Sequence, residues 1–415
     1  MGEEDKAARD SAVKVVIVGG GIAGVSAAES LRQAAPGAEI ILVSKEEELP
    51  YYRLNLTRHL AGEIGDEALP LRPEAWYEEN NIQLLRGKEV SALALDDLAV
   101  DLRDGDRLAF ERLIMTVGAH PFTPPIPGTA REGVTALRTL SDAKAIREMA
   151  VPGAKCVCIG GGLLGLETAG ALARHGVDVT VLERLGWFLP LQLTEKAGRM
   201  LADRVADIGI ALRPNAQVAE ILGDDRVRGV QLEGGDVLPT DLIVICTGIR
   251  PNSYLARLAG LKVNEGIVVN NRLETSHPNV LAAGDVAEHH GTVYGTWRPS
   301  QYQGRIAGMN AVEVGSEFDG MPLSTTLKVL GVKLFSIGIF QPQDGSYTTF
   351  DHEADGNYLR FVFQGTHLVG SILLGDAGLM ATIRKAIEGK ADFSDLLGKR
   401  PCPADVIAYL KERKT

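Results

Sequence analysis

The stretch VVIVGGGIAGVSAAES, residues 15–30, joins a short apolar run to glycines in the spacing G-x-G-x-x-G and then to a run of small residues. A second stretch, CVCIGGGLLGLETAG at residues 156–170, repeats this pattern. In each stretch the apolar run predicts a buried strand, the glycines predict a tight turn, and the small residues predict a helix. The sequence therefore predicts two strand–turn–helix units of the same kind.

The first unit has Gly19, Gly21 and Gly24 at the motif positions, with Ile22 and Ala23 opening the helix. In such a turn the first glycine permits the tight bend, the second lets a pyrophosphate approach the backbone, and the third lets the helix pack on the strand. One such motif is weak evidence, because a glycine-rich turn can also bind nothing. Two motifs in the same context are much stronger, and they predict one site for a fixed dinucleotide and one for a mobile dinucleotide.

The second unit carries an acidic residue where a nucleotide ribose is expected. Its motif glycines and the residues that open its helix are Gly160, Gly162, Leu163, Leu164 and Gly165. The strand VTVLE ends at Glu183, whose carboxylate can accept hydrogen bonds from both ribose hydroxyls and would repel a 2′-phosphate, so NAD is favoured over NADP. Two alternatives stay open: Arg184 either pairs with such a phosphate or is solvated, and Glu167, placed in the first helical turn, either faces the nicotinamide or has no role.

The first unit lacks this acidic residue. In IILVSKEEE, residues 40–48, Ser44 and Lys45 follow the strand, and Glu46 or Glu47 could take the place of the ribose-binding carboxylate. The adenosine end of the first dinucleotide is thus expected to be held in a different way.

Composition limits the partners. The chain of 415 residues has 54 acidic and 43 basic residues and a net charge of −11, which argues against nucleic acid and anionic membranes as partners. The charged start MGEEDKAARDS and the absence of any long apolar run predict a cytoplasmic protein that does not enter the membrane.

The four cysteines are too scattered for a disulfide framework, and Cys156 and Cys158, alternating on one strand, are expected to be buried. No metal-ligand spacing occurs, and the pair in EHHG, residues 288–291, is expected to be exposed.

Strand and helix patterns alternate along most of the chain, which predicts an α/β fold with parallel sheets. The proline-rich HPFTPPIPG, residues 120–128, and the region of CTGIRPN, residues 246–252, are expected to be crossings between domains. We expect a first dinucleotide-binding domain from residues 1–120 and 247–320, a second from residues 121–246, and a mixed α+β domain from residues 321–415. The last domain is predicted from TTLKVLGVKLFSIGIF and YLRFVFQGTHLVGSILLG, followed by a helical stretch.

Several further motifs resemble one family. TVGAHPFTPPIPG (with Val117 where alanine is usual), ICTGIRPN and NVLAAGDVAE are similar to segments of the pyridine nucleotide-disulfide oxidoreductase superfamily, flavoproteins with two Rossmann-like dinucleotide-binding domains. LPYYRLNLTRHL and STTLKVLGVKLFSIGIF look most like NADH:rubredoxin reductases and the flavoprotein part of assimilatory nitrite reductases. The resemblance covers nearly the whole chain.

This resemblance implies that the first motif holds FAD and that the second binds NAD(H). It implies flavin contacts at Asp285, and it places Arg53 and Asn55 near the isoalloxazine, although relatives often have YYRPRL where this chain has YYRLNL. The remaining residues that it places at the two sites are, for FAD, Ser44, Lys45, Thr116, Gly118, Gly284, Trp297, Ser300 and Gln301, and for NAD, Thr247 and Gly248.

The expected activity follows from what the chain lacks. Disulfide reductases of the superfamily carry a CxxxxC pair, and peroxidase-type members carry one redox cysteine near the equivalent of YYRLNL, but this chain has neither. Without a thiol, electrons must leave from the flavin itself, one at a time, to an iron-sulfur protein or to the iron-sulfur subunit of a larger complex. We therefore expect an FAD-containing NAD(H) oxidoreductase whose C-terminal domain docks a partner or forms a homodimer. The alternatives are a peroxide-producing NADH oxidase and a flavin-bearing structural or regulatory subunit.

Overall fold

The computed structural model describes residues 13–327 and 331–413, and these residues form two compact units. Unit 1 contains residues 13–55, 65–120 and 249–320, and unit 2 contains residues 56–64, 121–248 and 321–413. The charged N-terminal stretch, and residues 328–330 of the expected C-terminal strands, lie outside the described residues.

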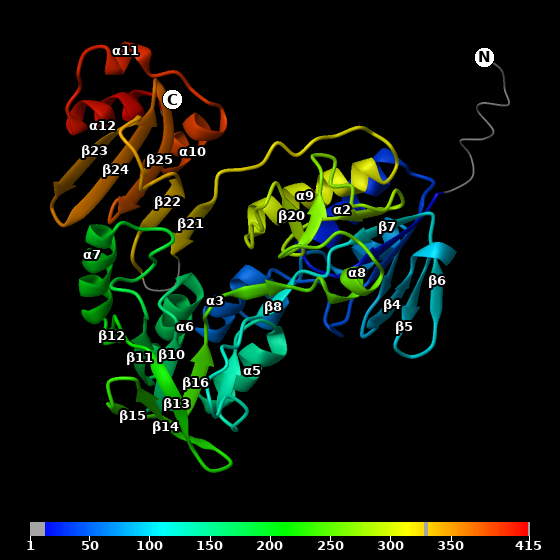
Figure 1. The fold of residues 1–415 in the computed structure, drawn as a ribbon, viewed down its shortest axis with the longest axis horizontal. Helices are drawn as coiled ribbons and strands as arrows, with labels where there is room; N and C mark the ends of the chain where they lie inside the picture. The colour runs from blue at the N-terminus through cyan, green and yellow to red at the C-terminus, as the bar shows by residue number, and fades with distance from the viewer. Residues whose placement is uncertain (1–12, 328–330, 414–415) are drawn as a thin grey trace. The chain divides into compact units, whose positions relative to one another are not determined.

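Unit 1 is built on a parallel five-stranded sheet (Figure 1). From edge to edge its strands are β19 (Val280–Ala282), β7 (Arg112–Met115), β1 (Lys14–Val18), β2 (Glu39–Val43) and β3 (Ile82–Leu85). The apolar run of β1 is buried from Val15 to Val18, as expected for a central strand covered on both faces. The chain moves outward from β1 through β2 to β3 and then returns to the other side of β1 at β7, so the sheet has a topological switch point between β1 and β7. Ligands of open α/β sheets bind at the carboxyl ends of strands beside such a point.

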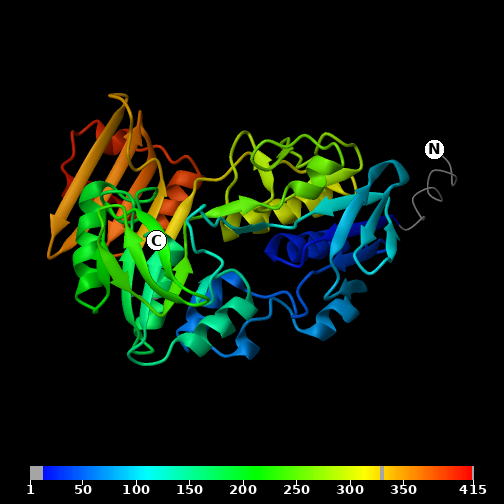
Figure 2. The same ribbon diagram turned by 60° about the horizontal axis from the view of Figure 1, so that its bottom comes forward.

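Two helices of unit 1 pack closely, and they lie side by side in Figures 1 and 2. These helices are α2 (Ile22–Ala34) and α9 (Trp297–Asn310). A Cβ atom on Gly304 would lie 2.2 Å from the carbonyl oxygen of Ala23, and one on Gly308 would lie 2.2 Å from that of Ala27. Only glycine allows this approach, which lays the second half of α9 along the first turns of α2, the helix of the first motif.

The remaining elements of unit 1 are small. They are the antiparallel sheet β4 (Val90–Ala94), β5 (Ala99–Leu102) and β6 (Arg107–Ala109), the pair β18 (Ile267–Val269) and β20 (Ala287–His289), and the helices α4 (Glu74–Glu79) and α8 (Tyr254–Leu258). The chain passes between the units in the paired strands β8 (Ala119–Pro121) and β17 (Ile249–Pro251).

Unit 2 contains a second parallel five-stranded sheet with the same switch of direction. Its strands are, in order, β12 (Ala211–Arg213), β11 (Asp178–Leu182), β10 (Lys155–Ile159), β16 (Leu242–Ile245) and β9 (Val134–Ala136). Its helices are α3 (Leu56–Leu60), α5 (Leu140–Met149), α6 (Leu163–Ala173) and α7 (Glu195–Ala206). The antiparallel strands β13 (Val218–Gly223), β14 (Val227–Leu232) and β15 (Val237–Pro239) cover part of the sheet and bury an aliphatic cluster against it.

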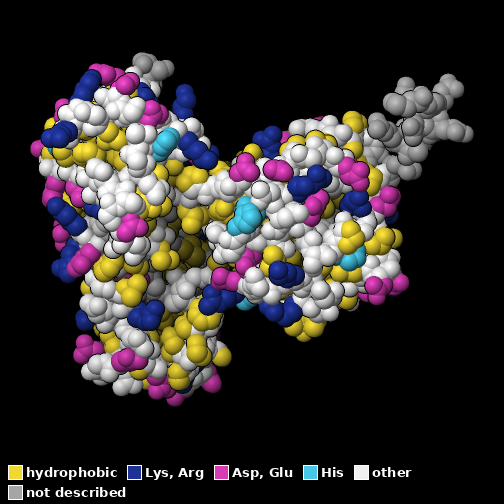
Figure 3. All heavy atoms as spheres, turned by 45° about the horizontal axis from the view of Figure 1, so that its top comes forward, with side chains coloured by type: hydrophobic (Ala, Val, Ile, Leu, Met, Phe, Trp, Pro, Cys, Tyr) yellow, Lys and Arg dark blue, Asp and Glu magenta, His cyan; other side chains and the backbone are white. Residues whose placement is uncertain are grey.

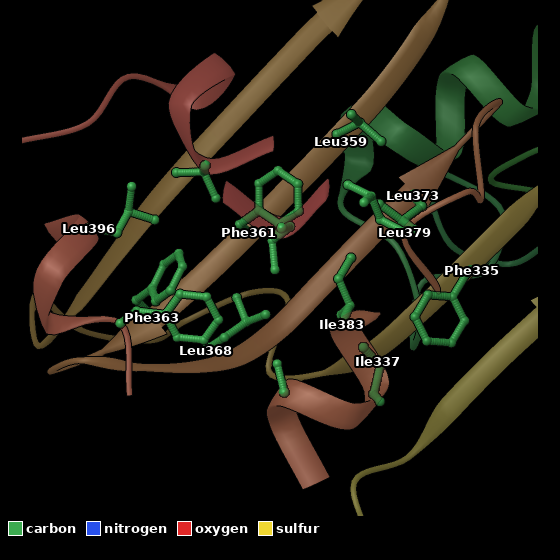
Figure 4. Close-up of a cluster of buried hydrophobic side chains, with 14 residues drawn as sticks. Phe335, Ile337, Leu359, Phe361, Phe363, Leu368, Leu373, Leu379, Ile383 and Leu396 are labelled. Carbon is green, nitrogen blue, oxygen red and sulfur yellow. The ribbon is translucent and has the colours of Figure 1, made fainter. Parts of the chain in front are cut away.

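The C-terminal part of unit 2 is an antiparallel sheet covered by helices on one face (Figures 1 and 2). Its strand order is β21 (Ser324–Leu327), β22 (Leu334–Gly338), β25 (His367–Leu374), β24 (Asn357–Gln364) and β23 (Tyr347–Ala354). The helices are α10 (Met380–Glu388), α11 (Ser394–Leu397) and α12 (Pro403–Glu412). Figure 4 shows the apolar core between sheet and helices, where Phe361 and Phe363 from β24 meet Ile383 and Leu396. The α/β fold class predicted from the sequence is confirmed, and this part has the expected α+β character.

Candidate dinucleotide sites

The first glycine loop is shaped by Gly19 and Gly24. Gly19 has φ +121°, and a Cβ atom there would lie 2.2 Å from the carbonyl oxygen of Thr116. A Cβ on Gly24 would lie 2.0 Å from the carbonyl oxygen of Gly19. The Thr116 hydroxyl closes the turn by donating to the carbonyl oxygens of Val18 and Gly19, at 3.0 Å each. The fold itself therefore requires glycine at these two positions.

Gly21, the middle glycine of the motif, is different. Its φ of −80° and ψ of −175° are open to any residue, and a Cβ atom there would have no protein atom within 4 Å. Protein packing therefore gives no reason for glycine at this position. A ligand that contacts the backbone at the N-terminus of α2 does give a reason, because a side chain would occupy the place of its phosphates. The loop thus fits a bound dinucleotide.

The residues that follow the other strands of this sheet are arranged at the same edge. Ser44 and Lys45 follow β2, Thr116 and Gly118 follow β7, and Gly284 with Asp285 follows β19. Because the carboxyl ends of parallel strands share one edge, these residues border the glycine loop. The Ser44 hydroxyl donates to the carbonyl oxygen of Glu46 at 3.3 Å, and Lys45 forms an exposed ion pair with Glu89 at 2.9 Å.

Glu46, one of two residues that could replace the missing ribose carboxylate, already has partners in the protein. Its Oε2 accepts a hydrogen bond from the Tyr51 hydroxyl at 2.6 Å, and its Oε1 accepts one from Arg53 at 2.5 Å. The guanidinium also lies 4.9 Å from the centroid of the Tyr51 ring. Burial lowers the pKa of Arg53, but Tyr51, Glu46 and Asp285 raise it by more, so the guanidinium stays charged. Glu46 therefore fixes Arg53 near Asp285, while Glu47 is exposed.

Aromatic stacking fixes the neighbouring residue. The rings of Tyr52 and Trp297 are stacked, with centroids 5.4 Å apart and 22° between their planes. Trp297 is the first residue of α9, so residues 51–53 lie at the N-terminus of that helix. Asn55 ends the short 3-10 helix Arg53–Asn55 that follows.

The turn after β19 is held by two side chains of α9. Ser300 is buried, and its hydroxyl donates to Asp285 Oδ1 at 3.1 Å, whereas Gln301 is exposed. Gln303 was not predicted as a site residue; its buried Oε1 accepts a hydrogen bond from the backbone N–H of Gly284 at 2.8 Å. Its three-residue spacing from Ser300 places both on one helix face, a signal that the sequence already contained. Within the described part of the chain, the buried Nε2 of Gln303 has no protein partner.

The second glycine loop repeats the first. Gly160 has φ +113°, and a Cβ there would lie 2.4 Å from the carbonyl oxygen of Cys246, while a Cβ on Gly165 would lie 1.9 Å from that of Gly160. Gly162 has φ −76°, and a Cβ there would again have no protein atom within 4 Å. The same reasoning therefore applies at the N-terminus of α6, and this loop also fits a dinucleotide.

Glu183 lies where the sequence predicted, at the end of β11. Its Oε2 accepts a hydrogen bond from the backbone N–H of Gly161 at 2.9 Å, and its Oε1 accepts one from that of Leu185 at 2.8 Å. A carboxylate has about four lone-pair sites, so two remain for ribose hydroxyls. Arg184 is exposed.

The other residues predicted at the second site lie on α6 and after β16. Leu163 and Leu164 begin the helix, whereas Glu167 is buried in its second turn rather than its first, and its Oε2 accepts a hydrogen bond from Thr57 at 2.9 Å. The Thr247 hydroxyl donates to the carbonyl oxygen of Phe122 at 2.7 Å, and Gly248 has φ +106°.

The thiols and histidines lie in ordinary structural positions. Cys156 and Cys158 are buried as predicted; hydrogen bonding to Cys156, together with burial, raises the pKa of Cys158. The prediction that both histidines of EHHG are exposed is wrong for His289. This residue ends β20 and is 2% exposed, because its ring packs edge-on against Phe318. His290 is exposed. In the described ranges, no group of three or more His, Cys, Asp or Glu side chains could hold a metal ion.

Two features concern the surface. Acidic and basic side chains are interspersed over the face shown in Figure 3. Among the helices of the described residues, none is long and apolar enough to cross a membrane.

Two family descriptions match the chain. Residues 13–304 match "Pyridine nucleotide-disulphide oxidoreductase", and residues 324–391 match "Rubredoxin NAD+ reductase C-terminal domain". The chain therefore belongs to the pyridine nucleotide-disulphide oxidoreductase family, whose members are NAD(P)H-dependent flavoenzymes that bind FAD and NAD(H). The resemblance and the cofactor class predicted from the sequence are confirmed.

Individual relatives support the same family. A nitrite reductase [NAD(P)H] of Bacillus subtilis is 36% identical over 387 residues, which are 92% of this chain and 48% of that protein. The chain thus spans about half the length of this relative. A rubredoxin-NAD(+) reductase of Pseudomonas putida is 35% identical over 284 residues, 68% of this chain and 74% of the relative. The reductase of a covalent putidaredoxin reductase–putidaredoxin complex superposes with a TM-score of 0.85 at 28% identity, covering 96% of this chain and 99% of that chain.

Proposed function

We propose that this chain takes a hydride from NADH onto bound FAD and passes the electrons singly to an iron-sulfur protein or to an iron-sulfur subunit. The observation that carries the proposal is the pair of open middle glycines, Gly21 and Gly162. Neither is required by the protein's own packing, and each lies at the N-terminus of a helix beside a topological switch point. Two dinucleotides on one chain suit a transfer of reducing equivalents between them.

The loop of Gly19, Gly21 and Gly24 would hold the FAD pyrophosphate. Asp285, fixed by Ser300, and the amide of Gln303 would bind polar groups of the flavin half, since Gln303 Nε2 is buried and still has a proton to donate. The guanidinium of Arg53 would lie near the isoalloxazine as a cation held by Glu46. When bound, FAD accepts a hydride and can release two electrons one at a time.

The second loop and Glu183 would hold NADH. The helix N-terminus at Gly162 favours the pyrophosphate, and the free lone pairs of Glu183 suit ribose hydroxyls. A 2′-phosphate in the same place would meet a carboxylate, so we propose NADH as the donor.

The chain has no cysteine at the positions where thiol-dependent members of the family carry their redox cysteines. Cysteines occur at positions 156, 158, 246 and 402, and none precedes the second motif. Burial raises the pKa of the Cys246 thiol, and Cys158 is also held protonated, so neither is a ready nucleophile. A one-electron acceptor is thus the suitable outlet. The matched C-terminal family and the rubredoxin and putidaredoxin reductase relatives support an iron-sulfur acceptor.

An anaerobic NADH titration of the FAD-loaded protein tests the proposal. One equivalent of NADH should bleach the flavin absorbance, and oxidised rubredoxin or a [2Fe–2S] ferredoxin should restore it. The Gly162→Val variant is the matched control, because a side chain there fills the open space of the second loop only. An NADH-insensitive flavin would favour a structural or regulatory role. Rapid recovery in air with stoichiometric peroxide and no response to iron-sulfur acceptors would favour an oxidase.

A second form of the same activity is suggested by the nitrite reductase relative. Because the chain spans 48% of the nitrite reductase relative, the same electron path could serve a larger enzyme. The mass and iron content of the protein isolated anaerobically from its own cells distinguish the two forms. Iron in excess of flavin indicates a complex, whereas an iron-free particle indicates a freestanding reductase.

A further inference from the structure

The crossover segment, residues 56–64, belongs to unit 2 although the residues on both sides of it, up to Asn55 and from Gly65, belong to unit 1. It contains α3, which packs against α5 and α6 (Figure 1). The chain thus leaves the unit of the first glycine loop, contacts the helix of the second loop, and returns. No sequence pattern required this path.

Polar contacts bind the crossover segment to α6 and to the residues after it. Thr57 Oγ1 donates to Glu167 Oε2 at 2.9 Å. The Nε2 atom of His175 lies 2.6 Å from the carbonyl oxygen of Leu60. Arg174 Nη1 and Glu63 Oε1 form an ion pair at 2.6 Å. The last contact is partly exposed and contributes little.

The Thr57–Glu167 contact is the buried one. Thr57 is 3% exposed and Glu167 is 6% exposed, so their hydrogen bond is shielded from water. Hydrogen bonds to charged groups are among the stronger ones in proteins. Movement of α6 should therefore carry Thr57 with it.

Four residues before Thr57, the chain is fixed in the other unit. Arg53 is paired with Glu46, and between these anchors run only the 3-10 helix Arg53–Asn55 and the start of α3. Glu167 itself lies five residues after Gly162, the open glycine of the second loop. Along the chain, Arg53 is thus joined to Glu167 by one turn of backbone and one side-chain contact.

From this arrangement we propose that the Thr57–Glu167 hydrogen bond couples NAD(H) binding at α6 to the conformation of residues 53–55 on the FAD side. In this coupling Thr57 is a positioning residue, which acts through its hydrogen bond to Glu167. The inference rests on the proposed function, because it needs NAD(H) at the second loop and FAD at the first. Ligand binding alters a distant segment when the ligand interacts differently with its two conformations, and a buried contact of this kind can transmit that difference.

Hydrogen exchange of the FAD-loaded protein, with and without NAD⁺, tests the coupling. NAD⁺ is the probe because it occupies the site without reducing the flavin. In the native protein, NAD⁺ should slow exchange both at the second loop, residues 160–165, and at residues 53–60. In Thr57→Val, protection at the loop should remain and the response at residues 53–60 should disappear. Thr57→Ser, which retains the hydroxyl, should respond like the native protein.

Reciprocity gives a second readout. If the contact couples the sites, its loss should weaken NAD⁺ binding to the FAD-loaded protein by about fivefold or more, the lower range of measured couplings. Glu167→Gln keeps an acceptor oxygen and should bind almost normally. Glu63→Gln weakens the partly exposed ion pairs with Arg174 and Arg58, keeps the Thr57–Glu167 contact, and should change neither readout. Should Thr57→Val fail to fold, Glu167→Asp withdraws the same oxygen with a smaller change in volume and should show the same loss.

The outcomes separate the two proposals. A Thr57→Val or Glu167→Asp protein whose residues 53–60 still respond to NAD⁺ as in the native protein would overturn the coupling alone. A native protein in which NAD⁺ leaves residues 160–165 unprotected would overturn the proposed NAD(H) site, and the coupling with it.

Discussion

The carboxylate of Glu183 accepts a hydrogen bond from the backbone N–H of Gly161 across 2.9 Å, which ties the end of β11 to the second glycine loop. Residue 161 has little room for anything but glycine, since a Cβ there would lie 2.3 Å from the Phe188 ring. The carboxylate is therefore held at the edge of the loop, where a ribose would lie.

This geometry predicts coenzyme preference. Glu183→Ala should lower kcat/KM for NADH by about 10- to 100-fold, the value of one or two lost charge-assisted hydrogen bonds, and should lower that for NADPH much less. Steady-state kinetics with both coenzymes and a common acceptor measure this change. Native protein that uses NADPH as efficiently as NADH would show that Glu183 does not select the coenzyme.

The glycines of the first loop should separate into two classes. Gly24→Ala should destabilise the fold by several kcal/mol, because its Cβ would lie 2.0 Å from the carbonyl oxygen of Gly19. Gly21→Ala should fold with nearly native stability without FAD but retain FAD at least tenfold less tightly, because its Cβ has only the ligand to meet.

Thermal unfolding of the FAD-free proteins and flavin content after dialysis measure the two effects. A Gly21→Ala protein that keeps a full complement of FAD after prolonged dialysis would count against a phosphate at this position.

The thiols should differ in reactivity. In the native protein Cys402, which is exposed, should react with a thiol reagent, whereas Cys156 and Cys158 should react only after unfolding. Cys246 should also be slow, because burial raises its pKa. A Cys402→Ser variant is the control and should show almost no fast reaction. Fast reaction of any remaining thiol in Cys402→Ser would contradict the burial of the other three thiols.

Glu288 should make stability depend on pH. Burial raises the pKa of its carboxyl, but hydrogen bonds from the Asn264 side chain and from the backbone N–H groups of Gly266 and Glu265 lower it by more. With the folded pKa below the unfolded value of about 4.3, this stabilisation is present above that pH and is lost as the pH falls through the folded pKa.

Glu288→Gln should therefore lower the free energy of unfolding by about 1–3 kcal/mol near neutral pH, and the difference from the native protein should shrink below about pH 4. Urea denaturation at several pH values measures it. Glu265→Gln is the matched control, since that side chain is exposed and its nearest ion pair, with Arg250, spans 3.6 Å. A Glu288 effect that is constant across this range would exclude the ionised carboxylate as its source.

Local signals in the sequence were sufficient for the two glycine loops and for Glu183, because each depends on residues close together in one strand–turn–helix unit. They were insufficient where distant segments decide the structure. Glu46 accepts hydrogen bonds from Tyr51 and Arg53 only because the loop that carries these residues folds back onto it. His289 is buried because Phe318, distant in the sequence, packs against it. The placement of the crossover segment in unit 2 depends on buried contacts with α6, which have no periodic signature.

The domain boundaries and the residue assignments at the two sites remain predictions. In particular, the C-terminal α+β part clusters with the second parallel sheet in one unit, where the sequence suggested a separate domain. The Ser336 hydroxyl, for example, donates to the carbonyl oxygen of Gln192 at 2.6 Å and so joins the C-terminal sheet to the rest of unit 2. Hydrophobic patterns in the sequence do not predict such a hydrogen bond.

The most direct measurement for the central claim is an anaerobic double-mixing experiment on the FAD-loaded protein. The flavin is first reduced with one equivalent of NADH and then mixed with oxidised rubredoxin, while both chromophores are followed. NADH should bleach the flavin rapidly, and the flavin should then recover as two equivalents of rubredoxin are reduced; Gly162→Val should slow the first step, because it hinders NADH binding, and leave the second step unchanged. A flavin that NADH does not reduce, or a reduced flavin that is inert to every iron-sulfur acceptor, would contradict the central claim.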